Sequence, residues 1–232
     1  MSSLHRFATQ EALVQALTEF CLARLNASLA EYHNVTLLLS GGSTPAPLYR
    51  RLGAQALPWE RLHLALVDER WVPPSDPASN EKLLRETLGA HAAARLQGIY
   101  EGSATPRQAL LEVNRRYAAL PRPWALGLLG LGPDGHTASL FPAAQGLEQA
   151  LATEQLCAAL DAKPSAVTGT HTARLSLSLS ALLSIDHLVL LFTGAAKWKV
   201  YQEALRNPAP ATTPVSYLLQ QTSVPLAIFW CP

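Results

Sequence analysis

"VTLLLSGGSTPAPLYRRL", residues 35–52, carries the local pattern that decides the fold. Its first five residues have the length and apolar continuity of a strand that is buried on both faces, as strands of parallel sheets are. Gly41 and Gly42 then permit a tight turn. Thr44 is expected to cap the following helix, and Pro45 suits its first position. The stretch therefore predicts a strand, a glycine turn and a helix in direct succession.

The same alternation of strand and helix continues along the chain. Apolar residues recur at helical spacing from about Thr9 to Leu29, which predicts an opening amphipathic helix. Segments 156–162 and 172–180 lack a long helix between them and can pair antiparallel, within a mixed sheet or as an excursion from it. Repeated units of this kind predict an α/β fold with a mainly parallel sheet. Further strands are expected at 62–68, 124–132, 186–194 and 225–230, and helices from residue 79 and over 105–119.

Length and composition favour one globular domain over residues 1–232. Hydrophobic residues make up 49% of the chain and charged residues 15%, which suits a packed core. No internal repeat or long Gly/Ser/Pro-rich linker divides the sequence. A formal net charge of +1 gives no reason to expect nucleic acid or an anionic membrane as the main partner. An anionic ligand must therefore be bound by a local cluster.

The cysteines and the opening segment indicate a cytoplasmic protein. Cys21, Cys157 and Cys231 lie far apart and form no C-x-x-C pair, so a zinc ribbon or redox pair is not expected. The first thirty residues lack the apolar core of a signal peptide, and no apolar run approaches the length of a membrane span.

Candidate ligand-binding residues follow the predicted strands, because ligands of open α/β sheets bind beyond the carboxyl ends of the strands. The glycine turn at 41–42 presents N–H groups that favour phosphate, although an ordinary tight turn also explains it. Asp68, Glu69 and Arg70 form a charge run that is commonly a solvated loop, yet the Arg70 guanidinium matches phosphate oxygens. Helix capping suffices to explain Ser79 and Asn80.

"GLGPDGHTASLF", residues 130–141, supplies a candidate general base. The neutral imidazole of His136 can take a proton from water, and Asp134 can orient it if the turn brings them together. A histidine hydrogen-bonded within a glycine-rich turn is the alternative. Arg174 and Lys197 add two cations after later strands, although solvent exposure is the usual fate of a lysine.

With these motifs in order, the chain resembles the 6-phosphogluconolactonase family over most of its length. The resemblance rests on "SGGSTPAPLYRRL", "VDERWVP", "SNEKLLRETL", "GLGPDGHTASLFP", "RLSLSLSALLSIDHLVLLFTGAAKWKV" and "PVSYLL". It implies a three-layer α/β/α fold, a modified Rossmann architecture related to glucosamine-6-phosphate deaminases and ribose-5-phosphate isomerases. It also implies hydrolysis of 6-phospho-D-glucono-1,5-lactone in the oxidative pentose phosphate pathway, without metal or cofactor. A small-molecule sugar phosphate is the expected partner, and a monomer is the expected state.

The resemblance further assigns expected roles to individual residues. His136 is the expected general base, with Asp134 beside it. The expected phosphate site comprises Ser43, Arg70, Arg174 and Lys197, completed by Gly41, Gly42 and Thr44, with Asp68 as a polar neighbour.

Two other functions share this fold. A glucosamine-6-phosphate deaminase carries a glutamate where Phe141 falls here, and usually an aromatic residue in place of Arg70. A catalytically silent sugar-phosphate sensor commonly gains a DNA-binding domain or loses the histidine. Phe141 and Arg70 therefore favour the lactonase over the deaminase, and the presence of His136 favours it over the sensor. An assay of ammonia release from glucosamine 6-phosphate separates the lactonase from the deaminase.

Overall fold

Seven strands form the main sheet of the computed structural model, which describes residues 2–206 and 212–232. They are Ser2–Arg6 (β1), Val35–Leu39 (β2), Leu62–Leu66 (β3), Leu96–Gln97 (β5), Trp124–Gly130 (β6), Leu188–Thr193 (β9) and Leu226–Cys231 (β10). Their order is β1-β10-β9-β6-β2-β3-β5, and every neighbouring pair is parallel. The predicted parallel α/β sheet is confirmed.

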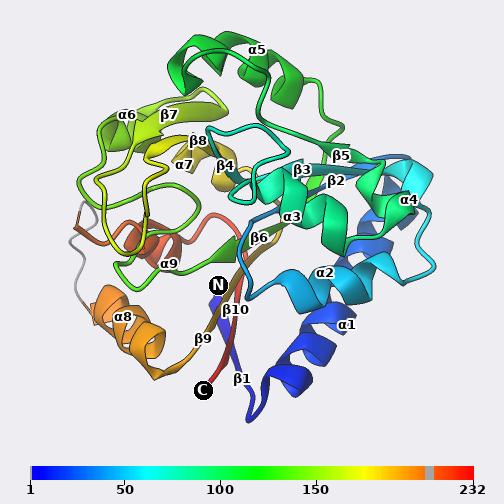
Figure 1. Ribbon diagram of the computed structural model, residues 1–232. Helices are drawn as coiled ribbons and strands as arrows, with labels where there is room; N and C mark the ends of the chain where they lie inside the picture. The colour runs from blue at the N-terminus through cyan, green and yellow to red at the C-terminus, as the bar shows by residue number, and fades with distance from the viewer. Residues whose placement is uncertain (1, 207–211) are drawn as a thin grey trace.

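Helices cover both faces of this sheet. They are Gln10–Glu31 (α1), Ala46–Gly53 (α2), Asn80–Thr87 (α3), Ala90–Ala93 (α4), Pro106–Ala118 (α5), Leu147–Ala152 (α6), Leu179–Leu182 (α7), Ala195–Arg206 (α8) and Val215–Gln220 (α9), with a 3₁₀ turn at Trp59–Arg61 (η1). Figure 1 shows α1 and α2 on one side of the sheet and α8 and α9 on the other. This is the three-layer α/β/α arrangement that the resemblance implies.

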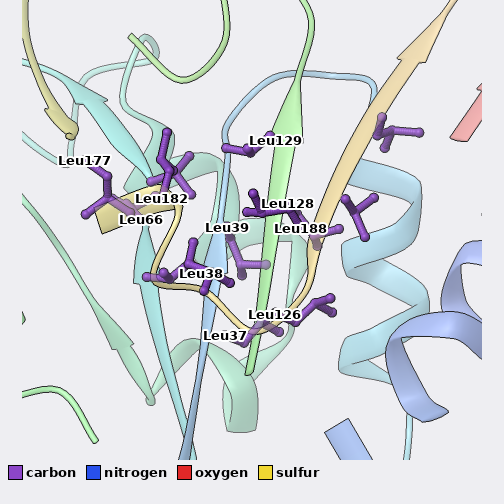
Figure 2. Packing of buried hydrophobic residues seen from close by; sticks show 14 of the residues in the cluster. Leu37, Leu38, Leu39, Leu66, Leu126, Leu128, Leu129, Leu177, Leu182 and Leu188 are labelled. Atoms are coloured by element: carbon purple, nitrogen blue, oxygen red, sulfur yellow. The ribbon is translucent and has the colours of Figure 1, made fainter. Parts of the chain in front are cut away.

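Buried leucines pack around the central strands of the main sheet. All five residues of β2 are buried, as expected for a strand covered on both faces. Figure 2 shows leucines of β2 packed beside leucines of β6 and β9. Those labelled on these strands are Leu37, Leu38, Leu39, Leu126, Leu128, Leu129 and Leu188.

A second, smaller sheet extends the fold above the main one (Figure 1). It consists of Asp68–Arg70 (β4), Cys157–Asp161 (β7) and Ala173–Leu177 (β8), in the antiparallel order β4-β8-β7. The antiparallel pairing expected for 156–162 and 172–180 is therefore confirmed, and it forms a separate sheet. The charge run at 68–70 is a strand of that sheet and not a solvated loop.

The predicted helix cap at Thr44 is wrong. The first hydrogen bond of α2 runs from the Tyr49 N–H to the Pro45 carbonyl, and Pro45 already has helical dihedral angles (φ −81°, ψ −11°). Pro45 therefore holds the N-cap position of α2, and no side-chain hydrogen bond from the described residues caps the helix. Thr44 precedes that position and lies in a turn.

Two strands are absent from the sequence-based prediction. β1 is polar and mostly exposed at the edge of the sheet, so no apolar pattern marks it. β5 has only two residues. Both owe their strand conformation to a neighbouring strand and not to their own sequence.

Candidate active site

The candidate site lies where the connections of the main sheet change direction. After β2 the chain moves outward to β3 and β5, then returns to place β6 on the other side of β2. Such a switch point leaves a crevice beyond the carboxyl ends of the strands. A cavity of about 270 Å³ occupies this position. The predicted site residues that line it are Gly41, Gly42, Thr44, Asp68, Arg70, His136, Arg174 and Lys197.

The structure places the two remaining predicted residues differently. Ser43 is exposed on the turn before α2. Asp134 lies behind His136 and contacts it directly. In the described part of the chain, neither side chain lines the cavity.

His136 and Asp134 form the hydrogen-bonded pair that the sequence alone left open. His136 Nδ1 lies 2.5 Å from Asp134 Oδ1, and the His136 N–H donates to the same oxygen at 3.2 Å. Burial opposes the charge of Asp134, but the hydrogen bond and the charge of His136 outweigh burial and lower the pKa of Asp134. Because Nδ1 is engaged by a carboxylate, Nε2 is the ring nitrogen available to the cavity.

Glycine is required beside this pair. A Cβ atom on Gly132 would lie 2.0 Å from His136 Nδ1 and 2.6 Å from Asp134 Oδ1. Gly135 adopts the left-handed conformation (φ +82°), which turns the chain between the two residues. The Gly132 N–H donates to the His136 carbonyl at 2.9 Å, which closes the loop.

Phe141 connects the histidine with the cationic part of the cavity. Its ring centroid lies 4.1 Å from that of His136, and the Arg174 guanidinium carbon lies 5.3 Å from the Phe141 ring centroid. The phenyl ring is almost fully buried. It therefore packs against the imidazole and restricts its movement.

Arg70 and Arg174 bring two positive charges to one place. They are cross-strand partners on β4 and β8, so their side chains share a face of the small sheet. Each is held by backbone carbonyls: Arg70 donates to Ala78 at 2.6 Å, and Arg174 to His171 at 2.8 Å and Thr168 at 3.2 Å. Burial lowers the pKa of Arg174 to about 10, an effect that Asp68 opposes and Arg70 increases. Two fixed, adjacent cations are a suitable site for a phosphate.

Lys197 is the third cation of the cavity. It lies on α8 and is partly buried, whereas Lys199 on the same helix is exposed. Burial lowers the pKa of Lys197, and the nearby charge of Asp134 opposes that shift. Solvent exposure therefore explains Lys199 but not Lys197.

Two residues of the site were not recognised from sequence. Asn80 is buried and lines the cavity, where its Nδ2 donates to the Asp68 carbonyl at 2.9 Å. Glu69 is fully buried behind the cavity. The signal for Glu69 is the charge run at 68–70, which a local pattern does not distinguish from a loop. Asn80 lies at the start of α3, where helix capping masks its second contact.

Within residues 2–206 and 212–232, no group of three or more His, Cys, Asp or Glu side chains is arranged to hold a metal ion. Over the same ranges, no helix combines the length and apolar character needed to span a membrane.

A histidine–carboxylate pair beside a cluster of cations is suited to an enzyme that carries out acid–base chemistry on an anionic substrate. A sequence profile described as "Glucosamine-6-phosphate isomerases/6-phosphogluconolactonase" matches residues 8–228, and the chain belongs to that family.

Individual relatives extend the similarity to the whole chain. The 6-phosphogluconolactonase of Rhizobium meliloti (strain 1021) is 35% identical over 236 residues, covering 100% of this chain and 99% of the relative. That of Xylella fastidiosa (strain Temecula1 / ATCC 700964) is 38% identical over 197 residues, or 84% of this chain and 82% of the relative. The crystal structure of a 6-phosphogluconolactonase from Shewanella baltica OS155 superposes with a TM-score of 0.94 at 33% identity, covering 100% of this chain and 98% of that chain.

Proposed function

We propose that this protein is a 6-phosphogluconolactonase, an ester hydrolase that converts 6-phospho-D-glucono-1,5-lactone to 6-phospho-D-gluconate. This is the second step of the oxidative pentose phosphate pathway. The observation that carries the proposal is that His136, paired with Asp134 at 2.5 Å, lines a cavity that Arg70, Arg174 and Lys197 also line. Family membership and relatives with this name support it.

In the proposed reaction His136 acts first as a base and then as an acid. Its Nε2 removes a proton from water while the water oxygen bonds to the lactone carbonyl carbon C1. The tetrahedral intermediate then expels the ring oxygen, which takes the proton from the imidazolium. Asp134, kept ionised by its lowered pKa, stabilises that imidazolium and fixes the ring. Acid–base catalysis of this kind contributes about 10²–10⁴-fold.

The substrate phosphate lies at the cationic part of the cavity in this proposal. Arg70 and Arg174 supply charged donors, and the Gly41–Gly42 turn supplies backbone N–H groups. The Tyr49 hydroxyl donates to the Ser40 carbonyl at 2.6 Å, which holds the start of that turn. Thr44 and Lys197 also line the cavity, and Ser43, exposed on the same turn, stays a predicted ligand. Asp68, whose Oδ2 accepts from Ser139 at 2.5 Å, is proposed to accept a hydrogen bond from a sugar hydroxyl.

The deaminase alternative is disfavoured by the contact between Phe141 and His136. An apolar ring occupies the position at which the resemblance places the glutamate of the deaminase relay.

A cytoplasmic location and a monomeric state stay predictions.

Substrate comparison tests the proposal. We expect rapid hydrolysis of freshly generated 6-phosphogluconolactone, a much lower kcat/KM for unphosphorylated gluconolactone, and no ammonia release from glucosamine 6-phosphate. Equal kcat/KM for the two lactones would contradict the proposed phosphate site, and ammonia release would favour the deaminase.

A further inference from the structure

Glu69 is buried between two residues of the candidate site without lining the cavity itself. It is the central residue of β4, and its side chain has no exposed surface. Successive side chains of a strand point to opposite faces. Asp68 and Arg70 line the cavity, so Glu69 points away from it and into the protein.

The Glu69 carboxylate accepts four hydrogen bonds. Oε1 accepts from the N–H groups of Arg70 and Asn80, both at 2.8 Å. Oε2 accepts from the Glu81 N–H at 2.8 Å and from the Ser79 hydroxyl at 3.0 Å. Two carboxylate oxygens offer about four acceptor positions, so the group is saturated. It joins β4 to the first turn of α3.

The same segment of α3 reaches the cavity through Asn80. The Asn80 Nδ2 donates to the Asp68 carbonyl, and its Oδ1 lies only 1.8 Å from where a Cβ on Gly41 would be. Asn80 thus contacts both the charged strand and the proposed phosphate-binding turn. The Ala78 carbonyl, two residues earlier, holds the Arg70 guanidinium.

We infer that Glu69 is a positioning residue for substrate binding, which locks the first turn of α3 onto β4 and thereby fixes Asn80 and Arg70 in the cavity. This inference rests on the proposed function. The locked N–H groups of Asn80 and Glu81 are directed at Glu69, so the start of α3 does not bind the substrate phosphate. Asn80 contributes through its side chain.

The substitution Glu69→Gln tests this role. Glutamine keeps the shape but presents one oxygen and one NH₂ group to donors from four directions, so at least one backbone N–H loses its acceptor. We expect KM for 6-phosphogluconolactone to rise about tenfold, the scale of one unsatisfied buried donor, with kcat changed less than about twofold. Hydrogen exchange at the Asn80 and Glu81 amides is expected to accelerate.

Glu81→Gln is the matched control. Glu81 is also buried in the first turn of α3, but its carboxylate accepts from Arg85 at 2.9 Å. This control is expected to leave KM unchanged. If Glu69→Gln folds poorly, Ser79→Ala removes one donor to the same carboxylate and is expected to raise KM about two- to threefold.

The outcomes separate this inference from the proposed function. An inactive wild-type enzyme would refute the function, and the exchange rates would still report the lock. Unchanged exchange at Asn80 and Glu81 in Glu69→Gln would overturn the inference. So would faster exchange with a KM equal to that of Glu81→Gln, because the lock would then be structural only.

Discussion

Arg70 and Arg174 lie directly opposite each other, in register, on the antiparallel strands β4 and β8. Like charges in such a pair destabilise a sheet, and the proposed phosphate dianion between them would relieve the repulsion. The two residues come from distant parts of the chain, so the structure brings together what no local motif contains.

The first prediction concerns Arg70. Arg70→Met is expected to raise KM for 6-phosphogluconolactone about 10- to 100-fold, the value of a lost charge-assisted hydrogen bond, with little change in kcat. KM for gluconolactone should not change. Arg115→Met, at an exposed arginine paired with Glu112 on α5, is the control. An equal effect on both lactones would contradict a phosphate role.

The second prediction concerns Gly132. Gly132→Ala places a methyl carbon 2.0 Å from His136 Nδ1 and 2.6 Å from Asp134 Oδ1, so the imidazole must rotate away from Asp134. Because the methyl group would displace a side-chain ring and not the backbone, the protein should still fold and bind 6-phosphogluconate. We expect kcat to fall by about 10²-fold or more, the range of a lost general base. Steady-state kinetics with a thermal unfolding control measure this, and an unchanged kcat would show that the pair is not required.

The third prediction concerns Asp134. Asp134→Asn keeps the size of the side chain but removes the charge that stabilises the imidazolium. We expect kcat to fall about 10²–10⁴-fold while KM stays near the wild-type value. Single-turnover hydrolysis measures this, and a loss confined to KM would mean that Asp134 only shapes the turn.

The fourth prediction is a pH dependence of stability. Burial raises the pKa of Glu69 from 4.5 to about 7, although its four hydrogen bonds oppose the shift. Between these values the folded state keeps a proton that the unfolded state has lost, so Glu69 makes the free energy of unfolding fall as pH rises. Glu69→Gln cannot bind or release this proton, so its free energy of unfolding should lack the decrease with pH that Glu69 contributes.

Urea unfolding of both proteins between about pH 4.5 and pH 8 tests the linkage. Groups that are common to both proteins cancel in the difference. The wild-type free energy is expected to decrease relative to the variant through this range and to run parallel above it. Parallel curves throughout would contradict the raised pKa.

The sequence predicts the parallel sheet because its strands are continuous apolar runs followed by a turn and a helix, as at residues 35–52. It also predicts most of the cavity, because parallel strands bring their carboxyl ends to one edge. It does not reveal β1, whose polar residues are ordered by β10. Nor does it reveal Glu69, because a charge run becomes a buried strand only through contacts with α3 and β8.

Sequence spacing also left the His136–Asp134 contact undecided. Side chains two positions apart can meet or point apart, depending on the backbone between them. Here the left-handed conformation of Gly135 turns the chain, and the absence of a Cβ on Gly132 leaves room for the two side chains to meet. The geometry strengthens the prediction of a general base, while its catalytic role stays a proposal.

The most direct test of that role is the rate of His136→Ala on freshly generated 6-phosphogluconolactone, corrected for spontaneous hydrolysis. We predict that kcat falls by about 10²–10⁴-fold while binding of 6-phosphogluconate persists. A corrected kcat equal to that of the wild type would contradict it.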